Sequence, residues 1–238
     1  MTSPAQDHAA GCLVCGADLA YLAAGAPMTC ALCGAARDSS ARCVAGHFVC
    51  DTCHAAPARE VIERTCVASD ERDPIALAVR LMRHPAVKVH GPEHHLLVPA
   101  VLLTAWWNAK GDPGRKAEAI REARRRSDPV AGGFCGLQGA CGAGIGTGIF
   151  AALATGSTPL AGPARGLSNR MTSRALQVIS GTDAARCCKR DSFLAILTAA
   201  RFAREHLGVD LPASGPRCEW TVTNRECARE ACPFHRAA

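Results

Sequence analysis

Potential metal ligands at short, regular spacings organise the first 56 residues of this chain. The ligands are Cys12, Cys15, Cys30, Cys33, Cys43, His47, Cys50 and Cys53. Two ligands separated by two or three residues lie on one tight turn and hold an ion from one side, and a second pair completes the tetrahedron. Eight ligands therefore predict two closed sites, typical of structural zinc, with rubredoxin-like iron as the alternative. Because this stretch has little apolar sequence, we expect residues 1–56 to form a module that folds only with its metal.

The spacing leaves two pairings of these ligands open. In sequential ribbons, one ion has the ligands Cys12, Cys15, Cys30 and Cys33, and the other has Cys43, His47, Cys50 and Cys53. In a cross-brace, one ion has Cys12, Cys15, Cys43 and His47, and the other has Cys30, Cys33, Cys50 and Cys53. From Cys30 to Cys53 the spacing resembles the first six ligands of a RING finger, but the last pair of that pattern is missing and a pair stands upstream instead. This departure argues against a ubiquitin-ligase function.

The composition favours a helical metal or thiol protein of the cytoplasm. Fifteen of the 238 residues are cysteine, yet the chain does not start with the basic and then apolar segment of a secretory signal. Thiols in the cytoplasm bind metal or take part in redox chemistry rather than form a disulfide scaffold. Only 4% of the residues are aromatic, and alanine and glycine dominate. We therefore expect a mostly α fold of closely packed helices.

Helical periodicity replaces the ligand pattern from residue 57. We expect helices over residues 57–66, 74–84, 92–103, 115–126, 132–153, 167–180 and 184–207. The second of these has Asp73 as N-cap and Pro74 at its first position. Residues 139–156 are uncharged and long enough to cross a bilayer, but their many glycines predict a buried core helix or helix pair instead. The predicted units are a two-metal module over residues 1–56, a helical core domain over 57–211 and a Cys/His-rich metal-binding tail over 212–238 that packs on the core.

The segment His90–His95 (HGPEHH) is the first candidate for chemistry in the predicted core. It matches the inverted zinc-peptidase pattern formally, but the glycine–proline pair in its middle places His90 before the helix rather than on its face. Glu93, His94 and His95 then occupy the first turn, where free N–H groups and the positive helix end favour a carboxylate. Two hypotheses remain open: N-terminal capping and packing, or a metal ligand or proton-transfer pair that points at a cleft.

Two cysteine pairs further along are candidates for reactive or cluster-binding thiols. Cys135 and Cys141 lie among closely spaced glycines, which permit a neighbouring backbone or a cofactor to approach. Cys187 and Cys188 are adjacent and are followed by two cationic residues, whose charges are expected to lower the thiol pKa and favour the thiolate. The predicted catalytic residues are Glu93, His94, His95, Cys135, Cys141, Cys187 and Cys188.

The C-terminal tail carries a further ligand group. Its members are Cys218, Cys227, Cys232 and His235. The spacing resembles that of an RNA-binding CCCH finger, although the last two gaps are each one residue short. Three cysteines also suit an iron–sulfur cluster whose fourth ligand comes from His235 or from Cys187-Cys188. The predicted cofactor-binding residues are Cys188, Cys218, Cys227 and Cys232, with His235 as a metal ligand.

Five motifs carry a resemblance to a known family. They are HGPEHHLLVPAVLL, GLQGACGAGIGTGIF, TGSTPL, GLSN and RCCKR, and they span roughly residues 75–235. With them the chain resembles an uncharacterised family of cysteine-rich bacterial and archaeal proteins, a domain of unknown function. The core also resembles the C-GCAxxG-C-C redox proteins. These resemblances imply a helical redox or metal protein.

Together these patterns predict a metal- and thiol-dependent redox or group-transfer protein, with sulfur handling among its reactions. We expect an oxidoreductase or transferase that holds two N-terminal zinc ions and an iron–sulfur cluster and works with a redox or group-transfer partner protein. Its centre should lie where the HGPEHH segment, the Cys141 segment and Cys187-Cys188 converge, within about 10 Å of one another.

The alternative is a non-catalytic zinc-dependent module that binds nucleic acid or protein through the basic run Arg121–Arg126. A net charge of +6 and few aromatic residues argue against nucleic acid as the partner. No membrane is expected as a partner.

Overall fold

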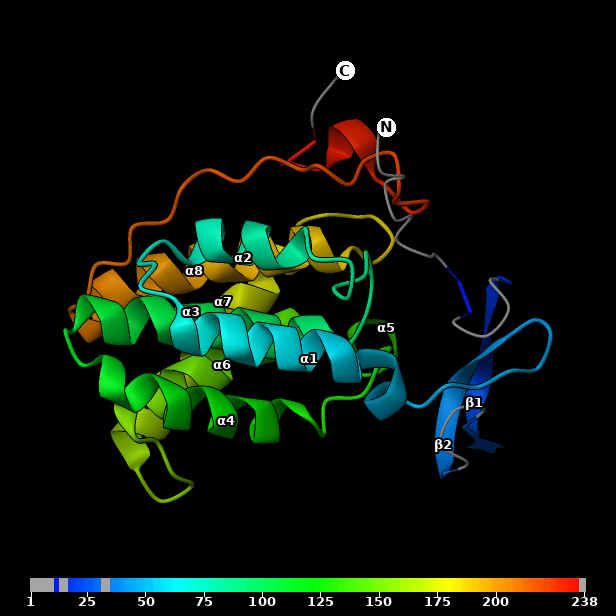
Figure 1. The fold of residues 1–238 in the computed structure, drawn as a ribbon, viewed down its shortest axis with the longest axis horizontal. Coiled ribbons are helices and arrows are strands. Elements are labelled where there is room, and N and C mark those ends of the chain that lie inside the picture. The colour runs from blue at the N-terminus through cyan, green and yellow to red at the C-terminus, as the bar shows by residue number, and fades with distance from the viewer. Residues whose placement is uncertain (1–10, 13–16, 31–34, 236–238) are drawn as a thin grey trace.

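The computed structural model describes residues 11–12, 17–30 and 35–235. Within these residues the chain is mostly helical, as predicted, with one two-stranded sheet (Figure 1). The strands are β1 (Leu19–Thr29) and β2 (Ala36–Cys43). The helices are α1 (Asp51–Ala68), α2 (Pro74–Met82), α3 (Glu93–Ala109), α4 (Lys116–Ser127), α5 (Phe134–Leu137), α6 (Gly142–Thr155), α7 (Gly162–Ser180) and α8 (Cys188–Leu207), with short 3-10 helices η1 (Pro113–Arg115) and η2 (Arg229–Ala231).

The two strands form an antiparallel hairpin that stands beside the helical body (Figure 1). Leu19 pairs with Cys43 at one end and Thr29 with Ala36 at the other, and the register shifts once after Tyr21. Most residues of the hairpin are exposed or half-buried. An isolated hairpin of this kind is marginally stable, so contacts outside the two strands, such as Asp18 with Arg225 and Tyr21 with Arg186, must contribute to its stability.

Helix α3 lies at the centre of the helical body. All of its residues except His95 and Ala109 are buried, which is the pattern of a helix that other helices surround. Helices α1, α2, α4, α6 and α8 contact it. Trp106 of α3 meets Phe150 of α6 edge to face, with ring centroids 5.8 Å apart. The core of the domain is therefore built around α3.

Helix α6 approaches its neighbours closely because glycine replaces larger side chains on its contacting faces. A Cβ atom at Gly148 would overlap Thr172 Oγ1 of α7, and one at Gly146 would lie 2.8 Å from Pro99 Cδ of α3. Its glycines and Phe150 are largely buried, so this part of the uncharged segment is a core helix. In the described part of the chain, no helix combines the length and the hydropathy that a bilayer crossing requires.

The segment after α8 returns along the helical body (Figure 1). Gly208 has a φ of 69° and ends α8, as such a left-handed C-cap commonly does. The chain then passes α2, where the Ser214 amide donates to Asp73 Oδ2 at 3.0 Å and Arg83 Nε donates to Glu219 Oε2 at 2.7 Å. This course brings the C-terminal cysteines back to the beginning of α8.

Several predicted boundaries differ from the structure. Helix α1 begins at Asp51 and continues through Pro57, so the predicted boundary at residue 56 falls inside a helix. Proline favours the first helical position, which predicted a start at residue 57; here the helix continues through it without that one N–H donor. Residues 132–153 contain α5 and most of α6, which agrees with the helix pair among the predicted alternatives, whereas α8 begins at Cys188 rather than at Ala184. The cap at Asp73 is confirmed, because its Oδ1 accepts from the Ile75 and Ala76 amides.

Candidate functional site

Three of the predicted N-terminal ligands meet at the end of the hairpin. The ligand atoms of Cys12, Cys43 and His47 all lie within 4.8 Å of one another, so this group could bind a metal ion. Cys43 Sγ lies 3.5 Å from His47 Nδ1 and accepts the His47 amide at 3.3 Å. Cys12 and Cys43 are buried. This grouping matches the cross-brace pairing, in which Cys15 would be the fourth ligand; Cys15 lies outside the described residues.

The second half of the module brings Cys30 to Cys50. The Cys50 amide donates to Cys30 Sγ at 3.3 Å, and both residues are buried with Phe48. The cross-brace pairing likewise assigns Cys30 and Cys50 to the same ion. Its remaining two ligands are Cys33, which lies outside the described residues, and Cys53, whose side chain does as well.

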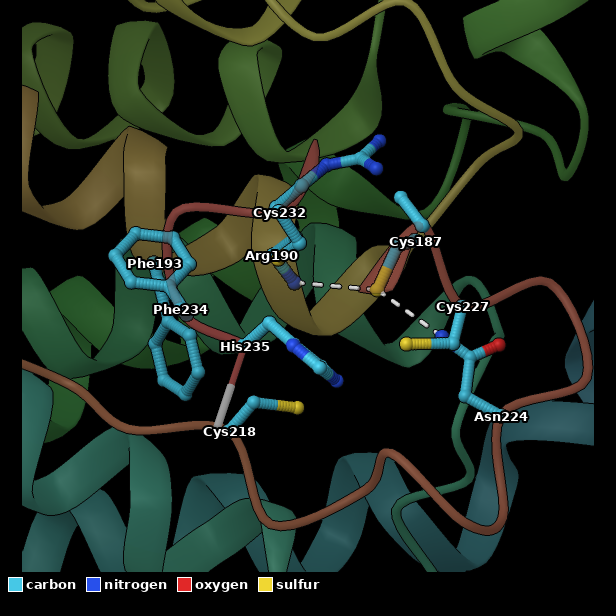
Figure 2. A pocket seen from close by; sticks show the side chains of 10 residues that line it. Cys187, Arg190, Phe193, Cys218, Asn224, Cys227, Cys232, Phe234 and His235 are labelled. Atoms are coloured by element: carbon cyan, nitrogen blue, oxygen red, sulfur yellow. Dashed lines mark hydrogen bonds between the residues drawn. The ribbon is translucent and has the colours of Figure 1, made fainter. Parts of the chain in front are cut away.

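The C-terminal cysteines gather around one small pocket at the beginning of α8. The pocket is lined by Cys187, Arg190, Phe193, Cys218, Asn224, Cys227, Ala228, Cys232, Phe234 and His235. Figure 2 shows the thiols of Cys218 and Cys227 and the ring of His235 around the same space, with Cys187 across from them. Phe193 and Phe234 close one side, with ring centroids 5.4 Å apart. Four thiols from segments far apart in the sequence therefore share one pocket.

The fourth thiol of this pocket is that of Cys187, whereas Cys188 was the predicted cofactor ligand. Cys187 is the N-cap of α8, and Cys188 is the first residue of the helix. The Cys188 thiol instead accepts the Gly91 amide in front of α3. Two adjacent residues at a helix start point in different directions, so only one of the two can face the tail cysteines.

Backbone and side-chain N–H groups point at the sulfur atoms of the pocket. Cys187 Sγ accepts from the Arg190 amide and from Asn224 Nδ2, both at 3.5 Å (Figure 2). Cys227 Sγ accepts the Arg229 amide at 3.4 Å, and the Phe234 amide bonds the Cys232 thiol. Such donors stabilise sulfur that carries negative charge, as metal-bound thiolates do.

Burial raises the pKa of the Cys187 thiol, contrary to the prediction from the neighbouring cations. Desolvation raises the pKa of Cys187 to about 11, although Arg190 acts in the opposite direction. Lys189 does not act as expected either, because its ammonium donates to the Met82 and Val87 carbonyls at 3.3 Å and lies over the Trp220 ring. The Cys187 thiol of the metal-free chain is therefore protonated at neutral pH.

The spacing of the pocket ligands is wider than one ion requires. Among the residues that the structure describes, only the Cys12, Cys43 and His47 group has three potential ligand atoms within 4.8 Å of one another. One zinc ion with bonds of about 2.3 Å would hold its thiolates about 3.8 Å apart. The pocket thiols thus lie farther apart than the ligands of one bound zinc ion.

The segments that the sequence analysis expected to converge do so at the beginnings of three helices. The Gly91 amide in front of α3 bonds the Cys188 thiol at the start of α8. Gly142 at the start of α6 lies so close to His95 that a Cβ atom there would overlap the imidazole. Cys141, the N-cap of α6, has its Sγ 3.9 Å from Asp191 Oδ2. The starts of α3, α6 and α8 therefore form one thiol- and imidazole-lined centre.

Glu93 and His94 are enclosed in this centre rather than solvated at a helix start. Their exposed fractions are 0% and 1%. Glu93 Oε1 accepts the Lys88 amide at 3.0 Å, and the carboxylate folds over Gly91. Burial raises the pKa of Glu93 and lowers that of His94 well below its ordinary value. Within the described residues, Glu93 Oε2 and His94 Nε2 have no hydrogen-bond partner, which is unusual for buried polar atoms.

The other residues of the predicted set lie around this centre. His95 Nδ1 donates to the Val130 carbonyl at 2.9 Å, which holds its ring against α6. Desolvation raises the pKa of Cys141 to about 12 and also raises that of Cys188. Cys135 is exposed on α5. It does not share the buried centre with the other thiols, although its charge influences Cys141.

Asn224 and His90, to which the sequence analysis gave no role in a site, connect the four-cysteine pocket with the segment in front of α3. Asn224 donates to Cys187 through Nδ2, and its Oδ1 accepts His90 Nε2 at 2.9 Å. His90 Nε2 also donates to Glu226 Oε2 at 3.1 Å. His90 was placed correctly before the helix, but no spacing in the sequence relates residue 90 to residue 224, so this connection could be found only in the fold.

The basic run on α4 is largely neutralised by carboxylates. Arg124 Nη1 lies 2.7 Å from Glu63 Oε2, and Arg125 and Arg126 both bond Glu122, at 2.6 and 2.7 Å. Arg121 is exposed. A nucleic-acid surface would instead present its cations without such partners.

Comparison with known proteins gives one match. Residues 62–235, well over half of the chain, match the model of a family of unknown function, DUF5714. No curated protein and no solved structure showed a significant match. The matched range contains both the four-cysteine pocket and the centre at the three helix starts, and it excludes the N-terminal ligands.

Proposed function

We propose that this chain, which belongs to the DUF5714 family, is a redox or group-transfer protein that holds an iron–sulfur cluster between Cys187 and the three tail cysteines. The observation that carries the proposal is the meeting of four thiols around one pocket. Three come from a tail with almost no regular structure, and the fourth caps α8. The tail packs Leu211 and Trp220 into the core, and a ligand shared by the four thiols would hold its end at this point as well.

The donor set and its surroundings fit a cluster. Four cysteines are the usual ligands of [2Fe–2S] and [4Fe–4S] groups. The N–H donors to Cys187, Cys227 and Cys232 match the bonds that tune such groups. Phe193 and Phe234 form an apolar wall that limits water. The buried Arg190 also lines the pocket, where its backbone amide donates to Cys187 Sγ while its guanidinium pairs with Asp191 at 2.9 Å.

The cluster would supply electron transfer, and the chain's own residues would supply the rest. Cys188 follows the ligand Cys187 directly and faces the centre at the three helix starts. There the Asp191 carboxylate lies where it can accept the proton of the Cys141 thiol. Glu93 and His94 are enclosed beside it, and each has a polar atom without a partner. We infer that this centre carries the thiol chemistry and proton transfer.

The N-terminal module supplies a second metal function in this proposal. We infer that it holds two zinc ions in a cross-brace, because Cys12 joins Cys43 and His47 while Cys30 joins Cys50. Closed four-ligand sites have no open position for a substrate, so their role is structural. The module would thereby fix the hairpin against the core.

Anaerobic reconstitution with iron and sulfide tests the proposal. We expect broad visible absorbance and about two or about four iron atoms per chain, with equal sulfide. Cys218→Ser and Cys232→Ser should lose most of this cluster. Cys135→Ser is the matched control, because its thiol is exposed and does not line the pocket. Equal cluster content in all three variants would contradict the assignment.

A second candidate is a zinc-dependent binding module without catalysis. The observation in its favour is that His235 also lines the pocket, which completes a Cys/His donor set for zinc. Protein isolated with zinc in this pocket, colourless and unable to take up iron and sulfide, would favour it. The ion pairs of Arg124, Arg125 and Arg126 argue that its partner would be a protein rather than a nucleic acid.

A further inference from the structure

A cleft separates the β hairpin from the helical core. Its volume is about 1030 Å³, near the upper end of the range for small-molecule sites. One wall is formed by residues of β1 and β2 together with residues 47–52 and His54, and the other by residues 88–92, α5, Thr223, Arg225 and Glu226. It shares no lining residue with the four-cysteine pocket. The cleft is thus a separate space that both parts of the molecule enclose.

Two cations in this cleft have no carboxylate partner among the described residues. The Arg186 guanidinium stacks over the Tyr21 ring, with its Cζ 5.4 Å from the centroid, and forms no ion pair there. The Lys88 ammonium is half-buried and donates only to the His54 carbonyl, at 3.0 Å. Both charges act on the His54 imidazole, whose pKa burial lowers to about 4 with their help. Lys88 and Arg186 therefore both lie near one neutral ring.

Most carboxylates of the cleft are engaged elsewhere. Asp18 pairs with Arg225 at 3.0 Å, and Asp128 pairs with Arg59 at 2.6 Å. Asp51 Oδ2 accepts the Gly132 amide at 2.9 Å, and Glu226 accepts His90. Asp38 is exposed on the hairpin. The Glu93 carboxylate acts on the Lys88 charge but forms no ion pair with it, so within the described residues neither Lys88 nor Arg186 is paired with a carboxylate.

We propose that Lys88 and Arg186 bind the oxyanion group, phosphate or carboxylate, of a small ligand in the cleft between the hairpin and the core. Arginine stacked on an aromatic ring keeps its N–H donors free for two-point binding of such a group, and a lysine adds a second point charge. Enclosure by two walls limits the ligand to a small molecule. The binding inference stands alone, and only the identification of this ligand as a substrate rests on the proposed function.

The site lies close to two of the candidate thiols. The charges of Cys135 and Cys188 both influence the Tyr21 hydroxyl, whose pKa burial raises. Tyr21 is the ring over which Arg186 lies. Cys135 directly follows Phe134, which lines the cleft, and its thiol is exposed, so it lies close to a ligand bound there. Cys135 is therefore a local reporter of the site.

Binding of inorganic phosphate to the metal-loaded full chain is the direct test, measured by calorimetry at constant ionic strength with succinate as the carboxylate probe. Lys88→Met and Arg186→Met should each weaken binding about three- to tenfold. Lys110→Met and Arg201→Met are the controls. Each control removes a charge of the same kind from the helix that follows the tested residue. Lys110 lies about 25 Å along α3, which follows Lys88, and Arg201 lies about 20 Å along α8, which follows Arg186. Equal affinity in all four variants would overturn the inference.

Alkylation of Cys135 provides an independent measurement. Anionic iodoacetate should react faster, relative to neutral iodoacetamide, at Cys135 than at a free thiol, and phosphate should slow both reactions. Arg186→Met should abolish the preference for iodoacetate, whereas Arg201→Met should keep it. No preference in the parent protein would count against the site. If one of the cleft variants fails to fold, the other decides. Phosphate binding that depends on Lys88 and Arg186 in a chain without a cluster would leave this inference intact and refute the proposed function.

Discussion

Replacing Gly142 by alanine should destabilise the protein, because the imidazole of His95 fills the space that a side chain would need. A Cβ atom at this position would overlap the ring. The ring cannot easily turn away, since His95 Nδ1 donates to the Val130 carbonyl at 2.9 Å. Either α6 moves away from α3, or His95 gives up this hydrogen bond.

The magnitude follows from these two costs. Forcing one extra carbon into a packed contact costs about 1–3 kcal/mol, and loss of the hydrogen bond costs about 1 kcal/mol. The better helix propensity of alanine returns less than about 1 kcal/mol at this first helical position. The net loss is about 2 kcal/mol, which for a domain of this size lowers the melting temperature by about 4–8 °C.

Thermal unfolding of the metal-loaded variants, followed by circular dichroism, measures this effect. The matched control is Gly166→Ala on α7, where a Cβ atom would meet nothing within 4 Å. In that open space alanine should stabilise the helix by up to about 1 kcal/mol. The two variants should therefore differ in sign. Equal melting temperatures for Gly142→Ala and Gly166→Ala would refute the close contact between α6 and His95.

Three further predictions concern the thiols and ligands. Burial raises the pKa of Cys66 to about 12 from 9.0. Above pH 9 the unfolded chain therefore loses this proton first, and the free energy of unfolding falls by up to about 1.4 kcal/mol per pH unit. In urea titrations at several pH values, Cys66→Ala should lack this contribution, and an unchanged dependence of the unfolding free energy on pH would contradict it. His47→Ala should lower bound zinc from about two ions to about one per chain, and metal analysis that still finds two would argue against His47 as a ligand. Asn224→Ala removes one N–H donor to Cys187 and should lower the reduction potential of a bound cluster by about 40 mV. Asn169 is exposed, so Asn169→Ala should leave the potential unchanged in the same redox titration.

Local features of the sequence were predicted well. The cap at Asp73, the helical class and the placement of His90 before α3 all depend on neighbours within a few residues. The same holds for the end of α8 at Gly208, where a left-handed residue follows the helix. Helix starts that depend on tertiary contacts were predicted less well. Helix α1 passes through Pro57 although propensity favoured a start there.

The candidate site was predicted only in part, because its residues are combined by long-range contacts. No local feature of the sequence shows whether Cys187 or Cys188 faces the tail cysteines. The direction of the first turn of α8 decides this, because it places Cys187 in the pocket and Cys188 near Gly91. The expected low thiol pKa was wrong for Cys187, since burial outweighs a nearby charge and burial is a property of the fold. Lys189 likewise lies in the interior, where it bonds backbone carbonyls.

The sequence by itself determined that this is a mostly helical, cysteine-rich chain with potential metal ligands at short spacings near its beginning and its end. Spacing of two or three residues places two ligands on one turn whatever surrounds them. Only the tertiary structure decided which pairs meet: Cys12 with Cys43 and His47, and Cys187 with the three tail cysteines. The physical reason is that a turn is set by adjacent residues, whereas the distance between turns is set by the packing of helices around α3 and by the return of the tail along α2.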